Sequence, residues 1–225
     1  MWQPNQLPTI AKQLTKAGLA LNPNDLTDLT GFPMGAIVSL GGCTASFVSD
    51  QGLVATNHHC VYGSVQYNST ADNNLLKNGF LAKSFKEELP ATPGSRIYVT
   101  EEINNVTAIV NAGLTENMSG TERYKAIDKN SKTLVAECEN DDRYRCSVVN
   151  FHGGLEYYLF KQLTIRDVRL VHAPASSVGK YGGDIDNWMW PRHTGDYGFY
   201  RAYVNKEGQP ADFHEDNVPD RKSVV

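Results

Sequence analysis

Apolar and polar residues alternate in short runs over most of the chain after residue 36, and this pattern is typical of β-strands. Residues 36–48 and 53–56 form two such runs, and the glycine-containing stretch between them predicts a hairpin turn. Later runs predict further strands over residues 97–100, 146–151, 157–163, 166–171 and 197–204. Many short strands separated by turns favour a mainly β fold, and we expect a β-barrel that carries insertions.

The start of the chain has a helical pattern instead. Apolar residues recur near one stripe over residues 7–20, and the polar stretch 22–25 marks the end of that stripe. We therefore expect a helical lead-in over residues 1–35, followed by the barrel over residues 36–225.

One helix is predicted inside the barrel. Ser119 and Glu122 have the spacing of a capping box, in which the two side chains satisfy backbone N–H groups at a helix start. Apolar residues then recur at helical intervals as far as Cys138, and the polar stretch 140–142 interrupts them. These signals predict an inserted helix near residues 120–139.

Composition and charge exclude two classes of protein. The 21 basic and 25 acidic residues give a net charge of −4, with the acids spread along the chain, which argues against a nucleic-acid partner. No apolar run approaches the roughly 20 residues that cross a bilayer, so we expect no membrane span. The first residues have neither the basic start nor the apolar stretch of a secretory leader.

The four cysteines fall into two local pairs, Cys43 with Cys60 and Cys138 with Cys146. Neither pair has the C-x2-C spacing of a zinc site, and free thiols are the alternative to disulfides. An even count at hairpin-like separations favours two disulfides and hence an oxidising compartment. We expect a periplasmic or secreted protein from which a leader was removed near Met1.

Two histidines stand at the end of the predicted strand 53–56, directly before Cys60. This arrangement resembles the chymotrypsin-like serine peptidases, whose general-base histidine ends a barrel strand beside a bridged cysteine. A base must be held within about 3 Å of its nucleophile, and a strand end fixed by a disulfide is a rigid support. By register against Cys60 the base is His59, with His58 its neighbour. The alternative is a pair of histidines that are merely packed or solvated.

A second cluster of chemically active side chains fills residues 182–197. Asp196 begins the predicted strand 197–204, which is how chymotrypsin-like enzymes place the acid that orients the histidine. The rival acids Asp184 and Asp186 lie among glycines, which favours a turn or loop-ordering role. The acids lack the spacing of an EF-hand calcium loop.

Two alternatives for these clusters remain open. His58, His59 and His193 could form a zinc site with an aspartate. Trp188 and Trp190 could plug one end of the barrel without contacting a ligand.

Three motifs extend the resemblance to most of the chain: residues 57–63, residues 78–80 with 87–90, and residues 182–196. They are similar to the bacterial dipeptidyl-peptidases of chymotrypsin-like fold, types seven and eleven. The resemblance implies a trypsin-like double-barrel peptidase that removes dipeptides from the free N-terminus of oligopeptides. It makes His59 the base and Asp196 the orienting acid, and Asn187 and Trp188 line the pocket for the substrate's α-amine. It also implies a homodimer that needs no metal or cofactor.

The sequence departs from that family in one respect: it has no Gly-x-Ser-Gly turn to supply the nucleophile. Ser119 stands at a predicted helix start, and Ser176 lacks the glycines of an oxyanion hole. We therefore expect an N-terminal fragment that lacks the second barrel and the helical domain and is inactive alone. The rival hypothesis is a non-catalytic module that binds peptide N-termini through Asn187 and Trp188.

Overall fold

The computed structural model describes residues 4–221, with every side chain except that of Asn187. The chain divides into two compact units: Met1–Gly35 with Val99–Thr164, and Ala36–Tyr98 with Ile165–Val225. Residues 99–164 thus group with residues 1–35 rather than with residues 36–98. Among the described residues, no helix is both long enough and apolar enough to cross a membrane.

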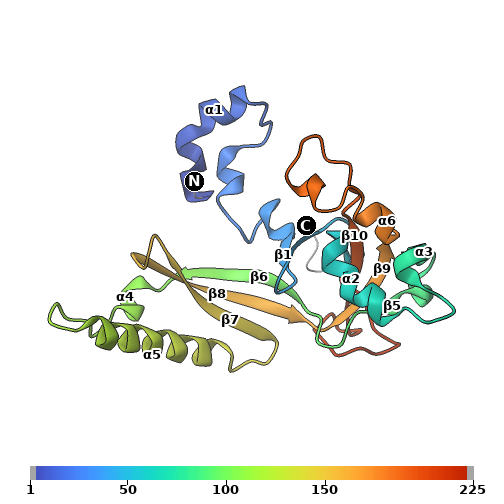
Figure 1. Ribbon diagram of the computed structural model, residues 1–225. Helices are drawn as coiled ribbons and strands as arrows, with labels where there is room; N and C mark the ends of the chain where they lie inside the picture. Colours follow the sequence, from blue (N-terminus) through green and yellow to red (C-terminus); the bar gives the residue numbers. More distant parts are fainter. Residues whose placement is uncertain (1–3, 222–225) are drawn as a thin grey trace. The chain divides into compact units, whose positions relative to one another are not determined.

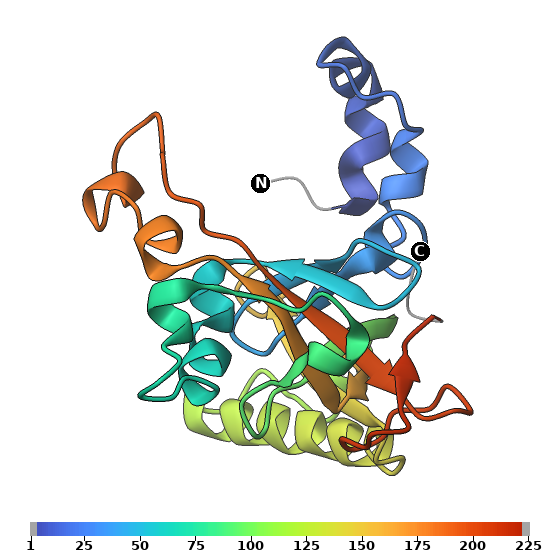
Figure 2. The same cartoon turned by 90° about the vertical axis from the view of Figure 1, so that its right-hand side faces the viewer.

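The second unit, which runs through residues 36–98 and 165–225, is an antiparallel sheet with short helices (Figures 1 and 2). Its strands are β1 (Ile37–Ser39), β2 (Thr44–Phe47), β3 (Leu53–Thr56), β4 (Phe80–Leu81), β5 (Leu89–Pro90), β9 (Asp167–Ala173), β10 (Gly198–Val204) and β11 (Val218–Pro219). They are ordered β4-β9-β10-β3-β2-β1, with β5 beside β9 and β11 beside β10. Its helical elements are α2 (His58–Tyr67), α3 (Leu75–Asn78), η4 (Phe85–Glu87), α6 (Ser176–Gly179) and η5 (Ile185–Asn187).

Apolar side chains from helix α2 and from the sheet form the core of this unit. Val61 and Val65 on α2 are buried, as are Val54 on β3, Leu170 on β9 and Ala202 on β10. Burying a valine or leucine side chain contributes about 1.5–3 kcal/mol relative to leaving it in water. This packing fixes α2, and with it His58 and His59, against the sheet.

A buried ionic group also lies in this unit, beside strand β10. The Nε of Arg201 donates to Oε1 of Glu88 at 2.7 Å, and the hydroxyl of Tyr203 donates to Oε2 at 2.8 Å. The Glu88 side chain is almost fully enclosed, so these bonds replace the water that its charge has lost.

The first unit packs a long helix on neighbouring strands of the sheet (Figure 1). The strands β6 (Ile97–Asn105), β8 (Glu156–Ile165) and β7 (Tyr144–Phe151) follow in that order across the sheet. The helical elements are η1 (Pro4–Ile10), α1 (Ala11–Lys16), η2 (Pro23–Leu26), α4 (Thr107–Val110) and α5 (Gly120–Cys138), and η3 (Met34–Ala36) crosses into the second unit. The core joins helices and sheet through Val106, Val110, Tyr157, Ile127, Leu134, Val148 and Leu159.

Helix α5 confirms the capping-box prediction. Oγ of Ser119 accepts the N–H of Glu122 at 3.3 Å, and the Glu122 carboxylate accepts the N–H of Ser119 at 2.9 Å. The Cys138–Cys146 disulfide ties the end of α5 to β7.

Two of the local predictions are wrong. The expected single strand over residues 36–48 is two strands, because Gly41 takes a φ of +89° that glycine favours and turns the chain. Residues 58–67 are helical, although no helix was predicted there. Cys60 therefore lies on the first turn of a helix.

The mainly β fold class is confirmed, with helical insertions on an antiparallel, barrel-like sheet.

Candidate active site

The side chains of His59 and Asp196 meet at the start of helix α2. Nδ1 of His59 lies 2.8 Å from Oδ2 of Asp196, within the distance expected for a base and its orienting acid. Oδ1 of Asp196 also accepts the backbone N–H of His59 at 3.0 Å, so one carboxylate holds both the ring and the helix start. An imidazole that donates from Nδ1 keeps the lone pair of Nε2 to accept a proton. The His59 side chain is 63% exposed, so a substrate can approach it.

Asn57, which is not among the residues predicted from the sequence, supports the same carboxylate. Its Nδ2 donates to the backbone oxygen of Asp196 at 3.2 Å and to Oδ2 at 3.3 Å. Asn57 is the N-cap residue of α2, but its side chain makes no cap hydrogen bond. The position of Asn57 directly before two histidines is the sequence feature that could have identified it.

The surroundings of Asp196 favour its ionised form. Burial alone would raise the pKa of Asp196, but hydrogen bonds from the backbone N–H and the ring of His59 outweigh burial and hold that pKa below its ordinary value. A carboxylate that stays ionised stabilises the positive charge that His59 acquires on accepting a proton.

His58 has a different environment from its neighbour. Its ring is completely buried and packs edge-on against Tyr62, with ring centroids 6.0 Å apart. Burial lowers the pKa of His58, so the ring is neutral near pH 7. A Cβ placed on Gly179 of helix α6 would lie 2.3 Å from Cγ of this ring. His58 is therefore a packing residue between two helices, and the exposed histidine of the pair is His59.

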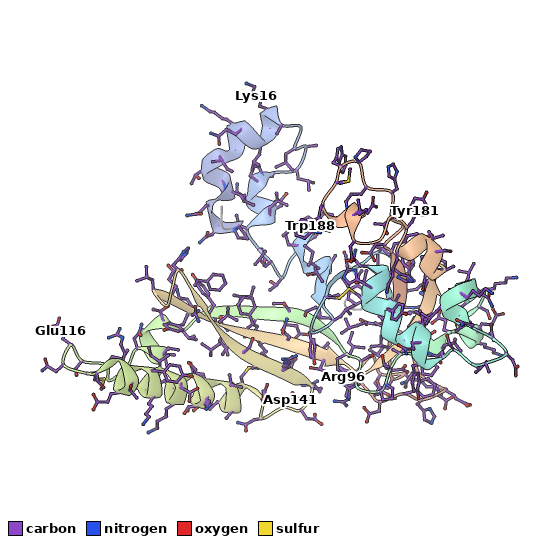
Figure 3. The ribbon with its side chains drawn as sticks, viewed as in Figure 1. Lys16, Arg96, Glu116, Asp141, Tyr181 and Trp188 are labelled. Atoms are coloured by element: carbon purple, nitrogen blue, oxygen red, sulfur yellow. A yellow bond between two sulfur atoms is a disulfide. The ribbon has the colours of Figure 1, made fainter. Side chains whose placement is uncertain are left out.

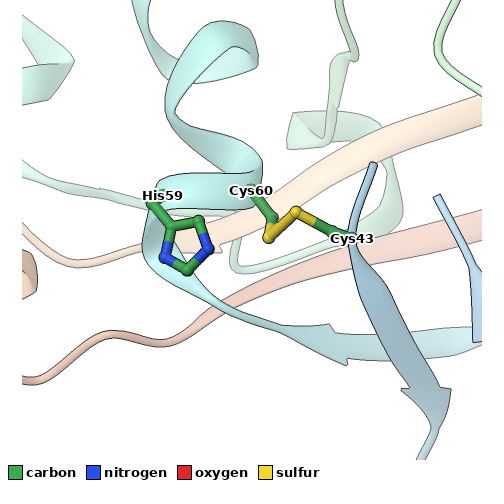
Figure 4. Close-up of side chains that lie close together, drawn as sticks. All are labelled: Cys43, His59 and Cys60. Atoms are coloured by element: carbon green, nitrogen blue, oxygen red, sulfur yellow. A yellow bond between two sulfur atoms is a disulfide. The ribbon is translucent and has the colours of Figure 1, made fainter. Parts of the chain in front are cut away.

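The Cys43–Cys60 disulfide fixes the first turn of α2 to the turn that follows β1, as Figure 4 shows beside His59. Among the described residues, one group of three side chains has potential metal-ligand atoms that all lie within 4.8 Å of one another: Cys43, His59 and Cys60. The two sulfurs are bonded to each other, which removes both thiolates as ligands. The predicted zinc alternative, with His58 and His193 beside His59, does not form among these residues.

The residues between α6 and β10 form a loop that carries Trp188 and Trp190, and we call residues 180–197 the tryptophan loop. It extends away from the sheet of its unit (Figure 2). The side chains of Trp188 and Trp190 are each 88% exposed, and Figure 3 labels Trp188 on this loop. Neither tryptophan plugs the barrel, so that alternative is wrong. The side chain of Asn187 lies outside the described part of the structure.

Asp186 organises this loop, in agreement with its predicted role. Its Oδ2 accepts the backbone N–H of His193 at 2.7 Å and that of Thr194 at 2.8 Å. Asp184, the other acid of the glycine-rich stretch, is exposed. Asp196 alone of the three acids bonds to His59.

The arrangement therefore contains an exposed imidazole whose Nδ1 is held by a carboxylate. Of the two serines considered as nucleophiles, Ser119 is the N-cap of α5, and Ser176 begins helix α6. The pair can take a proton from a hydroxyl at Nε2 of His59.

Comparisons with known proteins agree on one family. The Peptidase S46 family profile matches residues 1–224. The chain is 55% identical over 218 residues to an Asp/Glu-specific dipeptidyl-peptidase of Shewanella putrefaciens, covering 97% of this chain and 30% of that protein. It is 43% identical over 182 residues to dipeptidyl-peptidase 7 of Porphyromonas gingivalis, covering 80% of this chain and 25% of that protein.

A solved structure gives the same result at the level of the fold. The crystal structure of DPP11 of Porphyromonas endodontalis superposes with a TM-score of 0.85 at 41% identity, over 99% of this chain and 33% of that one. The chain thus spans about a quarter to a third of the length of these three proteins. The sequence motifs, the fold and the profile match over nearly every residue lead to one conclusion: this chain belongs to the peptidase S46 family.

Proposed function

We propose that this chain is the histidine- and aspartate-bearing part of a serine exopeptidase that releases dipeptides from the free N-terminus of oligopeptides. The observation that carries the proposal is the 2.8 Å contact between Nδ1 of His59 and Oδ2 of Asp196, with the same carboxylate on the His59 backbone. His59 takes the proton of the serine hydroxyl as it attacks, and Asp196 stabilises the imidazolium. His59 then returns the proton to the leaving amine.

The nucleophilic serine belongs, in this proposal, to a segment outside these 225 residues. Support comes from the relatives, since this chain covers 30% of the Shewanella protein and 33% of the DPP11 structure. An oriented imidazole without a nucleophile cannot form an acyl-enzyme, so the chain alone is expected to be inactive. The complete protein is expected to act as a homodimer in the periplasm or outside the cell.

Recognition of the free amine is assigned to Asn187 and Trp188. An ammonium group that leaves water needs hydrogen-bond acceptors, because burying an unpartnered charge is very costly. Asn187 offers an amide oxygen, and Trp188 offers a ring face for a cation–π contact of about 0.5–2 kcal/mol. The high exposure of Trp188 supports this role, because its ring is not already covered by the described residues of its own unit.

An acidic residue before the cleaved bond is the substrate preference we propose. The relative at 55% identity is an Asp/Glu-specific dipeptidyl-peptidase, whereas the dipeptidyl-peptidase 7 relatives match at 38–43%.

The experiment uses the complete protein and fluorogenic dipeptide reporters with a free or an acetylated N-terminus, with aspartate or leucine as second residue. Hydrolysis of the free reporters, fastest with aspartate, supports the proposal. Trp188→Ala should raise KM for the free reporter, and Trp190→Ala is the matched control. Binding of peptide N-termini without hydrolysis would favour the non-catalytic module, and equal turnover of free and acetylated reporters would exclude an exopeptidase.

A further inference from the structure

Asp186 is a buried carboxylate inside an otherwise exposed loop, and the reaction proposed above gives it no role. Its residue exposure is 7%, whereas Ile185 before it and Trp188 two positions after it are 68% and 88% exposed. An acid is almost never buried unless it is paired or hydrogen-bonded. The burial of Asp186 therefore indicates a specific function for its side chain.

The carboxylate of Asp186 joins two parts of the tryptophan loop that are separated in sequence. It lies in η5, directly before Asn187 and Trp188, and its Oδ2 accepts the N–H groups of His193 and Thr194 at 2.7 and 2.8 Å. Both bonds end on the same oxygen atom. The segment that carries Asn187 and Trp188 is thereby connected to the segment that leads into β10.

The backbone at Gly182 leaves room for this carboxylate. Gly182 has a φ of +83°, and a Cβ built on it would lie 2.6 Å from Cγ of Asp186. Any larger residue would be strained there and would displace the acid. The position of the Asp186 carboxylate therefore depends on a glycine at residue 182.

The negative charge of Asp186 strengthens its hydrogen bonds to the N–H groups of His193 and Thr194. The N–H of His193 is the main cause that holds the pKa of Asp186 below its ordinary value, so the group is ionised at neutral pH. Hydrogen bonds to an ionised acceptor are roughly twice as strong as those between neutral groups.

The segment that receives these bonds is itself anchored to the barrel unit. Oγ1 of Thr194 donates to the backbone oxygen of Gly179 at 2.8 Å, and the N–H of Gly195 donates to that of Val178 at 3.0 Å. Asp196 follows at once and is held by His59 and Asn57. The catalytic acid thus has supports of its own, whereas the Asn187–Trp188 segment reaches this anchored part through Asp186.

We propose that Asp186 is a positioning residue that holds the Asn187–Trp188 segment at a fixed place relative to His59 and Asp196. The inference rests on the proposed function and deepens it. A substrate whose amine is bound at a fixed distance from His59 presents its second peptide bond to the nucleophile. The Asp186 carboxylate therefore determines the length of the product, because it fixes the site of the amine.

The test compares four variants of the complete protein. Asp186→Ala removes the acceptor. Asp186→Glu keeps the charge but moves the oxygen by one methylene. Asp186→Asn keeps an oxygen that can accept both N–H groups, and Asp184→Ala is the matched control, with the same charge change at an exposed acid of the same loop. Each is assayed for kcat and KM with the free dipeptide reporter, and products from an unblocked hexapeptide are identified by mass spectrometry.

We expect Asp186→Ala and Asp186→Glu to raise KM about tenfold or more, with kcat changed less than about threefold, because the His59–Asp196 pair keeps its own supports. Tripeptides or single residues should appear beside dipeptides. Asp184→Ala should stay within about threefold of the unchanged protein and release only dipeptides. Asp186→Asn keeps the acceptor but loses the charge, so it should raise KM less than Asp186→Ala does. Melting temperatures show whether each variant folds. If Asp186→Ala does not fold, Asp186→Glu alone tests the positioning role of Asp186.

A folded Asp186→Glu protein with unchanged KM and dipeptide products overturns the inference. So does a fall in kcat without a rise in KM, which would place the effect on Asp196. Failure of the unchanged protein to prefer the free over the acetylated reporter would instead remove the proposed function.

Discussion

Replacing Gly179 by alanine adds a single methyl group beside the buried ring of His58. The new Cβ would lie 2.3 Å from Cγ, 2.5 Å from Nδ1 and 2.6 Å from Cδ2 of that ring. Ordinary van der Waals contact begins at 3.4 Å, so the two groups must separate by more than about 1 Å. His58 is completely buried and cannot turn into solvent, which leaves movement of helix α6 or of the α2 start as the response.

The magnitude follows from the packing. Inserting a methyl group into a filled core costs about 1–3 kcal/mol and occasionally more. The gain from replacing a helical glycine is about 0.5–1 kcal/mol and does not offset that cost. Subtracting the gain from the cost, we expect Gly179→Ala to lower the free energy of unfolding by about 0.5–2 kcal/mol.

Gly63 provides the matched control in helix α2. A Cβ there meets nothing closer than Oγ1 of Thr92 at 3.8 Å. Gly63→Ala should therefore stabilise the protein by about 0.5–1 kcal/mol, so the two identical substitutions have opposite signs. Urea unfolding followed by circular dichroism measures both.

The double variant Gly179→Ala with His58→Ala tests the cause. If the clash with the ring is responsible, removing the ring relieves it, and the two changes are non-additive by about 1 kcal/mol or more. Additive effects of the two substitutions, or equal effects of Gly179→Ala and Gly63→Ala, would refute the reasoning.

Three further predictions concern other parts of the second unit. Asp196→Asn in the complete protein should lower kcat by about 10³–10⁴-fold with little change in KM, measured with the free dipeptide reporter, and an unchanged kcat would contradict the role of Asp196. Glu88→Ala should lower the free energy of unfolding by about 3–5 kcal/mol in urea titrations, because Arg201 keeps a poorly solvated charge without its partner, and a loss below about 1 kcal/mol would refute this. Burial lowers the pKa of His58 in the folded protein below its ordinary value of 6.5. As the pH falls, the unfolded chain therefore binds a proton at His58 before the folded protein does. The free energy of unfolding should fall as the pH falls through 6.5 toward the pKa of His58 in the folded protein. His58→Phe should remove that part of the slope in urea unfolding between pH 7.5 and 5.5, and an identical slope in both proteins would show that other groups cause it.

The sequence predicted those features that local patterns determine. Ser119 and Glu122 specify a helix start through bonds three residues apart, and α5 begins there. The two cysteine pairs agree with the structure because their members lie close together in the sequence. The contact between His59 and Asp196 also agrees, and there the long-range pairing came from a resemblance in short motifs.

The features that the sequence did not predict depend on tertiary packing. Helix α2 begins with two histidines, a β-branched valine and Gly63, so its local propensity is weak, and it forms because Val61 and Val65 are buried against the sheet. The burial of His58 and the exposure of His59 also depend on tertiary packing. Gly179, which packs against the His58 ring, is far along the chain, so no local pattern predicts which histidine is buried.

The hydrolysis of an unblocked oligopeptide by the complete protein and by its His59→Ala variant tests the central claim most directly, with products identified by mass spectrometry over time. His193→Ala is the control, because its side chain is exposed on the tryptophan loop and its contact with Asp186 is made by the backbone N–H. The account predicts successive dipeptides from the N-terminus with the unchanged and His193→Ala proteins. It predicts a loss of at least about 10³-fold in rate with His59→Ala. Undiminished dipeptide release by the His59→Ala protein would contradict the account.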